Sequence, residues 1–325
     1  MAVYTHIGAE EMALLIEAFD VGALISAKGI AEGVENSNWL VDTAGRDGSG
    51  ARFILTVYEK RVQPAELPFF LGLLDHLAAA GCPVPRTVHD RTGAAFRMHG
   101  DKALALIEFL PGVSVDVPTQ AQGHAVGAAL ADMHLCARGY GVSRGNDLGV
   151  AGWRRLADAC AGHFSDIDAQ LGPLIRGELA ALERGWPADL PETVIHADLF
   201  PDNVLMIGDR VSGLIDFYFA CRDAMAYDLA VTHAAWCFDA AGRRFDPAVS
   251  AALLAGYHGV RPLTPAERAA LPLLARGAAL RFTLTRAYDW VHTPAGALVT
   301  RKDPLAFARR LAFYADPANG RLFAA

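Results

Sequence analysis

The amino-acid sequence predicts an α+β protein with two lobes, a small antiparallel sheet with one main helix and a larger, mostly helical lobe. Short β-prone runs separated by glycine and aspartate clusters fill the first third of the chain. After Gly112 the apolar residues recur instead at helical spacing. A length of 325 residues suits two domains or one domain with two lobes. We therefore expect lobes of residues 1–112 and 113–325, with the boundary near 112–118.

The first lobe is expected to be an antiparallel meander that carries one main helix. Breaker clusters such as residues 45–50 separate its strands. The main helix has Pro64 near its first turn and Gly81 just past its end, which is the usual asymmetry of helix ends. The expected elements are a helix at 9–19, strands at 23–27, 39–41 and 52–58, a helix at 65–79, and strands at 86–89, 94–98 and 103–109.

The second lobe is expected to be mostly helical because its apolar residues repeat every three to four positions. The helical segments are residues 121–136, 153–163, 171–182, 227–238, 249–257 and 266–290. A cleft between two lobes is a common place for a ligand, so we expect the ligand site there.

Composition excludes several classes of protein. Hydrophobic residues make up 53% and charged residues 20% of the chain, which rules out global disorder. A formal charge of −7 provides no basic excess for a nucleic-acid partner. The chain shows no transmembrane run and no signal-peptide pattern at its start. The five cysteines lack CxxC spacing and are interpreted as reduced thiols, so we expect a cytoplasmic protein without a membrane partner. The sequence indicates no particular oligomeric state.

One short pattern in the second lobe carries chemistry. His196, Asp198 and Asn203 form the sequence H-x-D-x-x-x-x-N. A carboxylate beside a metal-bound triphosphate can orient and deprotonate an attacking hydroxyl group, which is the role expected for Asp198. The alternative is a chance pattern on an ordinary surface loop, because this spacing alone is only fairly specific.

The residues that follow this pattern predict a metal site. Two apolar runs flank a hairpin turn, and a turn centred on 209–210 places Asn203 opposite Asp216 at the open end of the hairpin. Two hard oxygen donors side by side suit Mg²⁺, which binds through few protein ligands and keeps water and phosphate oxygens. Asn203 and Asp216 are therefore the expected magnesium ligands.

The whole segment resembles the catalytic and metal-binding loops of the kinase-like phosphotransferases, which include the aminoglycoside phosphotransferases and the choline kinases. This resemblance covers nearly the whole chain and implies a two-lobed protein-kinase-like fold, ATP and Mg²⁺ as cofactors, and His196 and Asp198 as catalytic residues. Residues 223–230 are similar to the family's D-P-x-Y-D-L-A helix start, which implies that Asp228 fixes the catalytic loop. A capping role is the alternative for Asp228.

The resemblance also implies a nucleotide site in the first lobe. Gly29 and Gly33 occupy the place of the turn that covers the phosphates, although a plain hairpin turn is an equal interpretation. Residues 107–110 resemble the hinge whose backbone receives adenine, which makes Glu108 and Leu110 nucleotide contacts. The end of a buried strand explains these two residues as well. Neither a G-x-G-x-x-G nor a Walker A pattern occurs in the chain.

The third strand departs from the family pattern. Thr56 stands where the family usually has a lysine that grips the phosphates, and Arg52 or Lys60 would have to reach in by another route. Glu66 best matches the family's helix glutamate, with a solvated acid at the helix start as the alternative. This departure supports a second hypothesis, a non-catalytic kinase-like protein that binds nucleotide or a partner. The intact Asp198 and its expected metal ligands argue against it.

Within the family, four stretches resemble the homoserine kinases, at residues 29–38, 53–60, 67–71 and 281–290. The resemblance implies that ATP phosphorylates L-homoserine to O-phospho-L-homoserine, a step of threonine biosynthesis. Homoserine kinases of a different fold carry a Gly/Ser-rich phosphate loop, which this chain lacks. The alternative is a kinase for another small hydroxylated amine, such as choline or an aminoglycoside.

L-Homoserine needs a cation for its carboxylate and an acid or carbonyl for its ammonium group. Arg286 and Asp289 are three apart on an expected helix and share a face, with an intrahelical ion pair as the alternative. Arg281 lies five residues before Arg286, about 140° round the same helix, so both need not face one site. His233 could also line the pocket, although an isolated residue of this kind is more often part of the core.

Overall fold

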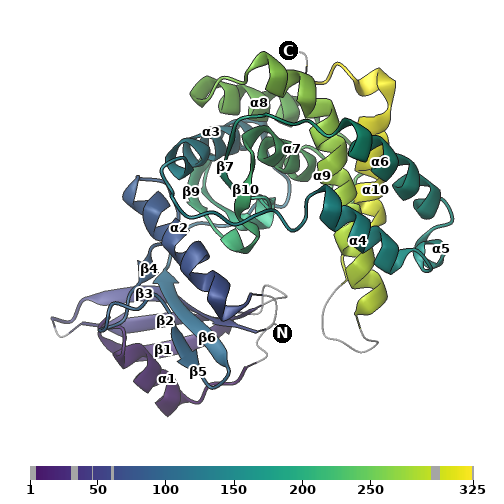
Figure 1. The fold of residues 1–325 in the computed structure, drawn as a ribbon. Coiled ribbons are helices and arrows are strands. Elements are labelled where there is room, and N and C mark those ends of the chain that lie inside the picture. The colour runs from purple at the N-terminus through teal and green to yellow at the C-terminus, as the bar shows by residue number, and fades with distance from the viewer. Residues whose placement is uncertain (1–4, 31–35, 46, 60–61, 294–300, 324–325) are drawn as a thin grey trace. The chain divides into compact units, whose positions relative to one another are not determined.

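A computed structural model of the chain describes residues 5–30, 36–45, 47–59, 62–293 and 301–323 (Figure 1). The chain divides into two compact units, Met1–Pro111 and Gly112–Ala325. This division falls one residue before the boundary expected from the change in hydrophobic pattern.

The first unit contains an antiparallel six-stranded sheet with the strand order β1-β2-β3-β6-β4, in which β5 also pairs with β6. Its elements are α1 (Ala9–Glu17), β1 (Ala23–Ile30), β2 (Asn36–Ala44), β3 (Gly50–Tyr58), η1 (Pro64–Glu66), α2 (Leu67–Ala79), β4 (Thr87–Val88), β5 (Arg97–His99) and β6 (Lys102–Glu108). Every element expected in this part of the sequence is present, and β1 and β2 are longer than expected. Gly81 follows α2 with a φ of 89°, as its position after the helix predicts.

The core of the first unit lies between α1 and the sheet. Met12 and Ile16 of α1 are buried against the central strands, which contribute Leu55, Val57 and Leu106 among others. The alternation of these positions along β3 puts one row of apolar side chains toward α1. The second helix is fastened to an edge strand instead, since the Thr87 side chain donates to a main-chain carbonyl of α2 (3.1 Å).

The second unit is mostly helical, as expected, with two small antiparallel sheets. Its elements are α3 (Gln120–Ala137), α4 (Val150–Cys160), α5 (Phe164–Ile167), α6 (Leu171–Gly185), β7 (Glu192–Ile195), η2 (Pro201–Asn203), β8 (Val204–Ile207), β9 (Arg210–Leu214), η3 (Phe217–Phe219), β10 (Cys221–Ala224), α7 (Met225–Trp236), α8 (Pro247–Val260), α9 (Pro265–His292), α10 (Leu305–Ala315) and η4 (Pro317–Asn319). Strand β7 pairs with β10, and β8 pairs with β9. Every residue of α7 is buried, so this helix forms the centre of the unit.

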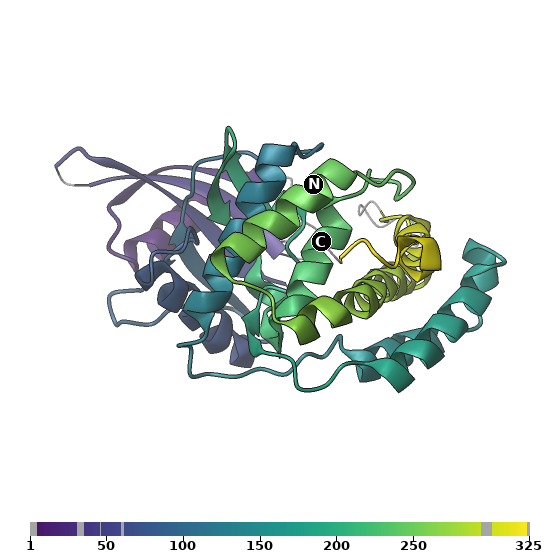
Figure 2. The same cartoon turned by 90° about the horizontal axis from the view of Figure 1, so that it is seen from above.

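Helices α3 and α8 lie side by side in both views (Figure 1, Figure 2). They approach closely because each has a glycine at the contact. A Cβ on Gly127 would lie 2.1 Å from the carbonyl oxygen of Leu253, and a Cβ on Gly256 would lie 2.1 Å from that of His124. These distances are far below van der Waals contact, so the two backbones could not come this close with larger residues.

Three features of the second unit were not expected from the sequence: the pair β7 and β10, the short helix α5, and α10 near the C-terminus. The two strands have four residues each, too few to show a period of two. In α10 the charged Arg310 occupies a buried position, which interrupts the apolar pattern. In the part of the chain that the structure describes, no helix has both the length and the apolar character needed to cross a bilayer.

Candidate active site

The loop that follows β7 contains the H-x-D pattern, and the carboxylate of Asp228 accepts two hydrogen bonds from its backbone. The main-chain N–H groups of His196 and Ala197 donate to the two carboxylate oxygens of Asp228, each at 2.8 Å. Ala197 has a φ of 63°, which is a strained left-handed conformation for a residue with a Cβ. Asp228 is completely buried. Its interactions are therefore those of a residue that fixes the loop, as the family resemblance implies.

The imidazole of His196 lies behind the loop. It is fully buried, its Nδ1 accepts the main-chain N–H of Asp198 (3.2 Å), and its Nε2 bonds to the carbonyl of Ile215 (2.9 Å). Because a carbonyl only accepts, Nε2 carries the proton. Burial lowers the pKa of His196 and keeps the ring neutral. The ring thus joins the catalytic loop to the strand end that carries the predicted metal ligand.

Asn203 is held against Asp198 by two hydrogen bonds. Its side-chain Nδ2 donates to the main-chain carbonyl of Asp198 (2.8 Å) and to the Asp198 carboxylate (3.2 Å). The short turn η2 makes this possible, because it brings Asn203 back toward Asp198 across the four intervening residues. With the amide nitrogen bound in this way, the amide oxygen of Asn203 points away from these two acceptors.

The predicted register of the hairpin is wrong by one residue. Asn203 stands opposite Ile215 rather than Asp216, since the Ile215 N–H donates to the Asn203 carbonyl (3.0 Å). The hairpin closes with a two-residue turn between Ile207 and Arg210, one residue earlier than expected, and the pairing shifts by one residue between Leu205 and Met206, where β9 has the extra residue Ser212. Asp216 is the next residue along, and its left-handed backbone (φ 66°) starts η3.

Asp216 nevertheless lies close enough to Asp198 for the two charges to interact. Burial raises the pKa of Asp198 to about 7, and the charge of Asp216 acts in the same direction, while Arg281 and Lys302 oppose it. A second carboxylate placed here disfavours ionisation of the first unless a cation lies between them. The charge of Asp216 thus reaches Asp198, and a divalent cation beside the two acids would favour the ionised form of both.

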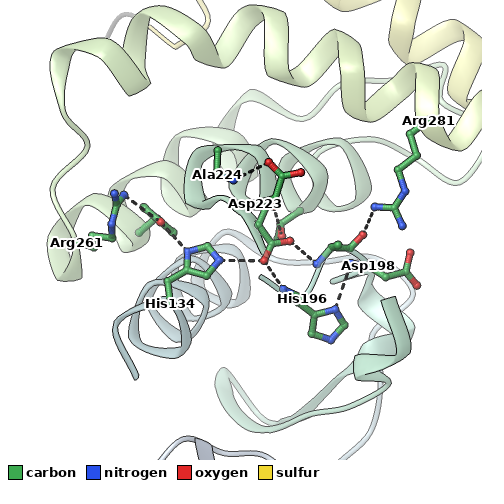
Figure 3. Close-up of polar contacts among 11 residues, drawn as sticks. His134, His196, Asp198, Asp223, Ala224, Arg261 and Arg281 are labelled. Carbon is green, nitrogen blue, oxygen red and sulfur yellow. Dashed lines mark hydrogen bonds and ion pairs between the residues drawn. The ribbon is translucent and has the colours of Figure 1, made fainter. Parts of the chain in front are cut away.

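Arg281 clamps helix α9 to the catalytic loop. Its guanidinium donates to the carbonyl of Ala197 and lies over the rings of Phe282 (4.6 Å) and Phe219 (5.4 Å). The side chain is 1% exposed. Figure 3 shows it reaching down from α9 toward the loop, next to Asp198. The Arg281 guanidinium is therefore bound to the main chain of the catalytic loop.

Arg286, one turn further along α9, is only partly buried. Its guanidinium lies 4.5 Å from the centre of the Phe307 ring and donates to the carbonyl of Asp303 (3.2 Å). Burial lowers its pKa to about 10, and the charge of Asp198 is the first of the opposing effects. The arginine is thus within electrostatic reach of the candidate catalytic carboxylate. It also faces Arg310, whose positive charge sits 4.2 Å from the same ring.

The other two predicted substrate residues have different surroundings. Asp289 is exposed, and its charge contributes to a raised pKa of the Cys160 thiol on α4, which is mainly due to burial. His233 is completely buried, with Tyr314 (2.6 Å) and Ser250 (2.8 Å) bonded to its two ring nitrogens. Burial lowers the pKa of His233 to about 3. Both nitrogens of this histidine are thus occupied by residues of the core.

In the first unit, the predicted nucleotide residues have these positions. Gly29 pairs with Trp39 inside the ladder of β1 and β2, so it is a strand residue, and Gly33 lies outside the described residues. Thr56 is buried and donates to the side chain of Asn38 (2.8 Å). Arg52 forms an ion pair with Asp42 (2.9 Å), and Lys60 lies outside the described residues.

Two further nucleotide candidates make local contacts. The Glu66 carboxylate accepts the main-chain N–H of Gln63 (3.3 Å) and completes a capping box at the start of η1. Glu108 is the last residue of β6 and accepts the N–H of Arg86 (3.4 Å), while Leu110 follows in irregular chain. The capping alternative therefore accounts for the observed contact of Glu66.

Sequence reasoning missed three residues of this region: His134, Lys302 and Arg310. His134 bonds to Asp228 (2.9 Å) from a helix 94 residues earlier, a pairing without a local signal. Lys302 forms an ion pair with Asp202 (3.5 Å) and lies over the ring of Phe200 (5.8 Å). Lys302 lies just before α10 and Arg310 lies within it. Because this helix was not expected from the sequence, neither residue was considered.

Comparisons with known proteins agree with this geometry. Residues 26–263 match the sequence model of the phosphotransferase enzyme family. A homoserine kinase of Azorhizobium caulinodans is 51% identical and one of Methylobacterium radiotolerans is 50% identical, each over 99% of this chain and 98% of the relative. A solved spectinomycin phosphotransferase, in complex with ADP and spectinomycin, covers 99% of both chains with a TM-score of 0.69 at 13% identity. That likeness confirms the expected kinase-like fold.

Proposed function

The chain belongs to the phosphotransferase enzyme family, and from this premise we propose that it transfers the γ-phosphoryl group of ATP to the hydroxyl group of L-homoserine. The observation that carries the substrate is the identity of about half of all residues with two homoserine kinases, across nearly the full length of each. The products are ADP and O-phospho-L-homoserine, which we place in threonine biosynthesis in the cytoplasm. All five cysteines are free thiols, which suits that compartment.

Asp198 is the proposed catalytic base. As the substrate oxygen bonds to the γ-phosphorus, its proton passes to the Asp198 carboxylate, and the bond from phosphorus to the bridging oxygen breaks to release ADP. Two contacts support this role. The Asn203 amide donates to Asp198, and the main chain just before Asp198 is held by the hydrogen bond from Ala197 to Asp228. A group held this firmly contributes chiefly by positioning the nucleophile. His196 is then a positioning residue, because its ring is buried behind the loop.

The donor set beside Asp198 fits Mg²⁺. Asn203 and Asp216 would hold the ion, which would supply charge neutralisation for the triphosphate. Among the described residues, no group of three or more His, Cys, Asp or Glu side chains could hold a metal ion. This suits Mg²⁺, because the ion is usually bound by one or two carboxylates together with the phosphates of the substrate.

For the substrate carboxylate we propose Arg286. It is partly buried, it keeps a positive charge, and it is close enough to Asp198 to sense that charge. A guanidinium in a partly desolvated place is well suited to a carboxylate. Arg281 and His233 are left out of this proposal, because the first donates to the loop backbone and the second is saturated in the core. Asp289 stays the candidate for the ammonium group on the strength of its position three residues along the same helix.

The nucleotide contacts are proposed from the resemblance alone. Glu108 and Leu110 stand just before the end of the first unit, where a hinge backbone would receive adenine. The resemblance is likewise the only support for four further nucleotide contacts in the first unit, Gly29, Gly33, Thr56 and Glu66. Thr56 is committed to Asn38, so another group must grip the phosphates.

A substrate panel tests the proposal. ADP release is measured with Mg·ATP and L-homoserine, L-serine, homoserinol, choline or kanamycin as acceptor, and ³¹P NMR identifies the phosphate ester. We expect L-homoserine to give the highest kcat/KM. A preference for choline or kanamycin would contradict the amino-acid substrate. The absence of turnover with every acceptor would favour the non-catalytic hypothesis.

A further inference from the structure

A continuous chain of buried hydrogen bonds runs from the start of α9 to the catalytic loop. Its side chains come from four different helices and from the residue that follows one of them, and each is at most 5% exposed. The members, in order, are Glu267, Arg261, Tyr257, His134, Asp228 and the N–H groups of His196 and Ala197. Figure 3 shows the run from Arg261 through His134 to the loop before Asp198. The proposed phosphotransfer mechanism uses only the last of these hydrogen bonds, those between Asp228 and the catalytic loop.

Chemistry fixes the direction of the bond between His134 and Asp228. The Asp228 carboxylate has only acceptor sites, and it lies 2.9 Å from Nε2 of His134. Nε2 therefore carries a proton. Burial acts to raise the pKa of Asp228, but the hydrogen bonds from the His134 side chain and from the main-chain N–H of His196 outweigh it, so the pKa is lowered overall. An ionised Asp228 can accept hydrogen bonds from all three of its donors, the His134 side chain and the main-chain N–H groups of His196 and Ala197.

The other end of the chain decides what His134 does with its second nitrogen. Arg261 has only donors, and its guanidinium lies 3.2 Å from the Tyr257 hydroxyl oxygen, which must accept. The proton of the Tyr257 hydroxyl is then available for Nδ1 of His134, at 2.8 Å. Burial raises the pKa of Tyr257, so the hydroxyl keeps its proton. All donors and acceptors match when His134 is neutral and protonated on Nε2.

The anchor of this chain is itself held in place. Glu267 accepts from the Arg261 guanidinium (2.6 Å) and from the main-chain N–H of Thr264 (2.9 Å), and its own N–H donates to the Thr264 hydroxyl (3.2 Å). Glu267 is therefore the third residue of a capping box and the ion-pair partner of a buried arginine at once. Because the capping box holds the Glu267 carboxylate in place, the ion pair also fixes the position of the Arg261 guanidinium.

We propose that Tyr257, anchored by Arg261 and Glu267, is a positioning residue for phosphoryl transfer: it orients the neutral ring of His134, which in turn donates to Asp228, the residue that holds the strained backbone before Asp198. The proposal rests on the proposed kinase function. Without the Tyr257 hydroxyl, Nδ1 of His134 loses its hydrogen-bond donor, and one of the two contacts that orient the ring is gone. The contact between His134 and Asp228 then weakens, and Ala197 is freer to leave its left-handed conformation.

The same unit contains a natural control. The Tyr314 hydroxyl bonds to Nδ1 of the buried His233 at 2.6 Å, so a second tyrosine–histidine pair exists in a similar environment. The far nitrogen of His233 bonds to Ser250, however, and not to a residue that holds the catalytic loop. Tyr257→Phe and Tyr314→Phe each remove a bond from a tyrosine hydroxyl to Nδ1 of a buried histidine, and Tyr257→Phe also removes the acceptor of Arg261. Only the first tyrosine is connected to Asp198.

The experiment compares these two variants in the full chain. We expect both to melt at lower temperature than the parent protein by similar amounts. Tyr257→Phe should lower kcat about tenfold, with KM for ATP and for L-homoserine within twofold of the parent, because the loss is one of alignment. Tyr314→Phe should keep kcat within twofold. An unchanged kcat in Tyr257→Phe, or an equal loss of kcat in both variants, would overturn the proposal.

A second measurement keeps the proposal testable if Tyr257→Phe does not fold, or if the parent protein does not phosphorylate homoserine. ¹⁵N-labelled histidine in the parent protein reports the tautomer of each ring, and the His134 signals are assigned by their loss in His134→Gln. We expect the Nε2–H form for His134. A ring protonated on Nδ1, or on both nitrogens, at pH 7.5 would overturn the proposed role whatever the substrate.

Discussion

The side-chain amide of Asn203 binds both the main-chain carbonyl and the carboxylate of Asp198, at 2.8 and 3.2 Å. One residue thus orients the proposed base through its amide nitrogen, while its amide oxygen is the proposed cation ligand. The two functions are chemically separable, because the nitrogen serves the first and the oxygen the second.

The first prediction concerns the base. Asp198→Asn keeps the size of the side chain but removes the proton acceptor, so kcat should fall by about 10²–10⁴ while the affinity for ATP stays within a few-fold. Steady-state kinetics and nucleotide titration measure the two quantities. Asp202→Asn is the matched control, since Asp202 is an exposed acid four residues away with a weak ion pair to Lys302. If Asp198→Asn retains half of the parental kcat, Asp198 is not the base.

The second prediction concerns the cation. Asp216→Ala should abolish turnover and weaken the binding of Mg·ATP, and Asn203→Ala should raise the Mg²⁺ concentration needed for half-maximal rate. Both are measured by Mg²⁺ titration at fixed ATP. Asp209→Ala, in the exposed turn of the same hairpin, should behave like the parent. An Mg²⁺ dependence that is unchanged in both site variants would contradict their role as ligands.

The third prediction concerns the substrate carboxylate. Arg286→Ala should cost about 2–5 kcal/mol of homoserine binding, a rise in KM of roughly 30-fold or more, with little change in KM for ATP. Homoserinol, which lacks the carboxylate, should be a poor acceptor and lose little further in the variant. Arg309→Ala is the control, since this arginine also contacts Asp303 (3.5 Å) but lies on α10. A silent Arg286→Ala with homoserine as substrate would place the carboxylate partner elsewhere.

The fourth prediction concerns stability in acid. His233 has an ordinary pKa of 6.5 when unfolded and about 3 when buried, so below pH 6.5 the unfolded state binds a proton that the folded state does not. Stability is therefore fully present above pH 6.5 and falls as the pH drops, by up to about 1.4 kcal/mol per pH unit. Denaturant unfolding at pH 7.5, 6.0 and 5.0 should show a smaller loss in His233→Gln than in the parent. The exposed His163→Gln is the control, and equal slopes in all three proteins would refute the prediction.

The sequence was most informative where a pattern is local. Helical spacing predicted the long helices of the second unit, and breaker clusters predicted the meander of the first. The pairing of Asp198 with Asn203 also follows from a short motif, because only four residues separate them and the short turn η2 closes that stretch. In each case the physical cause lies within a few residues of the feature.

Prediction failed where the cause lies far along the chain or depends on one irregularity. The position of Asp216 was wrong by one residue, since an earlier turn and the extra residue in β9 are not encoded in the hydrophobic pattern. The contact of Arg281 with Ala197 joins residues 84 apart, and that of His134 with Tyr257 joins residues 123 apart. Such contacts depend on helix packing, and no window of sequence contains both partners.

The glycines that let α3 and α8 approach have a consequence for engineering the protein. Replacing a helical glycine by alanine usually stabilises a helix by up to about 1 kcal/mol, so Gly127 and Gly256 would attract any scheme that improves helix propensity. Here an added methyl group would collide with a carbonyl oxygen of the opposite helix. Because His134 belongs to α3 and Tyr257 to α8, the forced separation would stretch the bond between them. A glycine-to-alanine substitution chosen to stabilise either helix would therefore be expected to lower kcat.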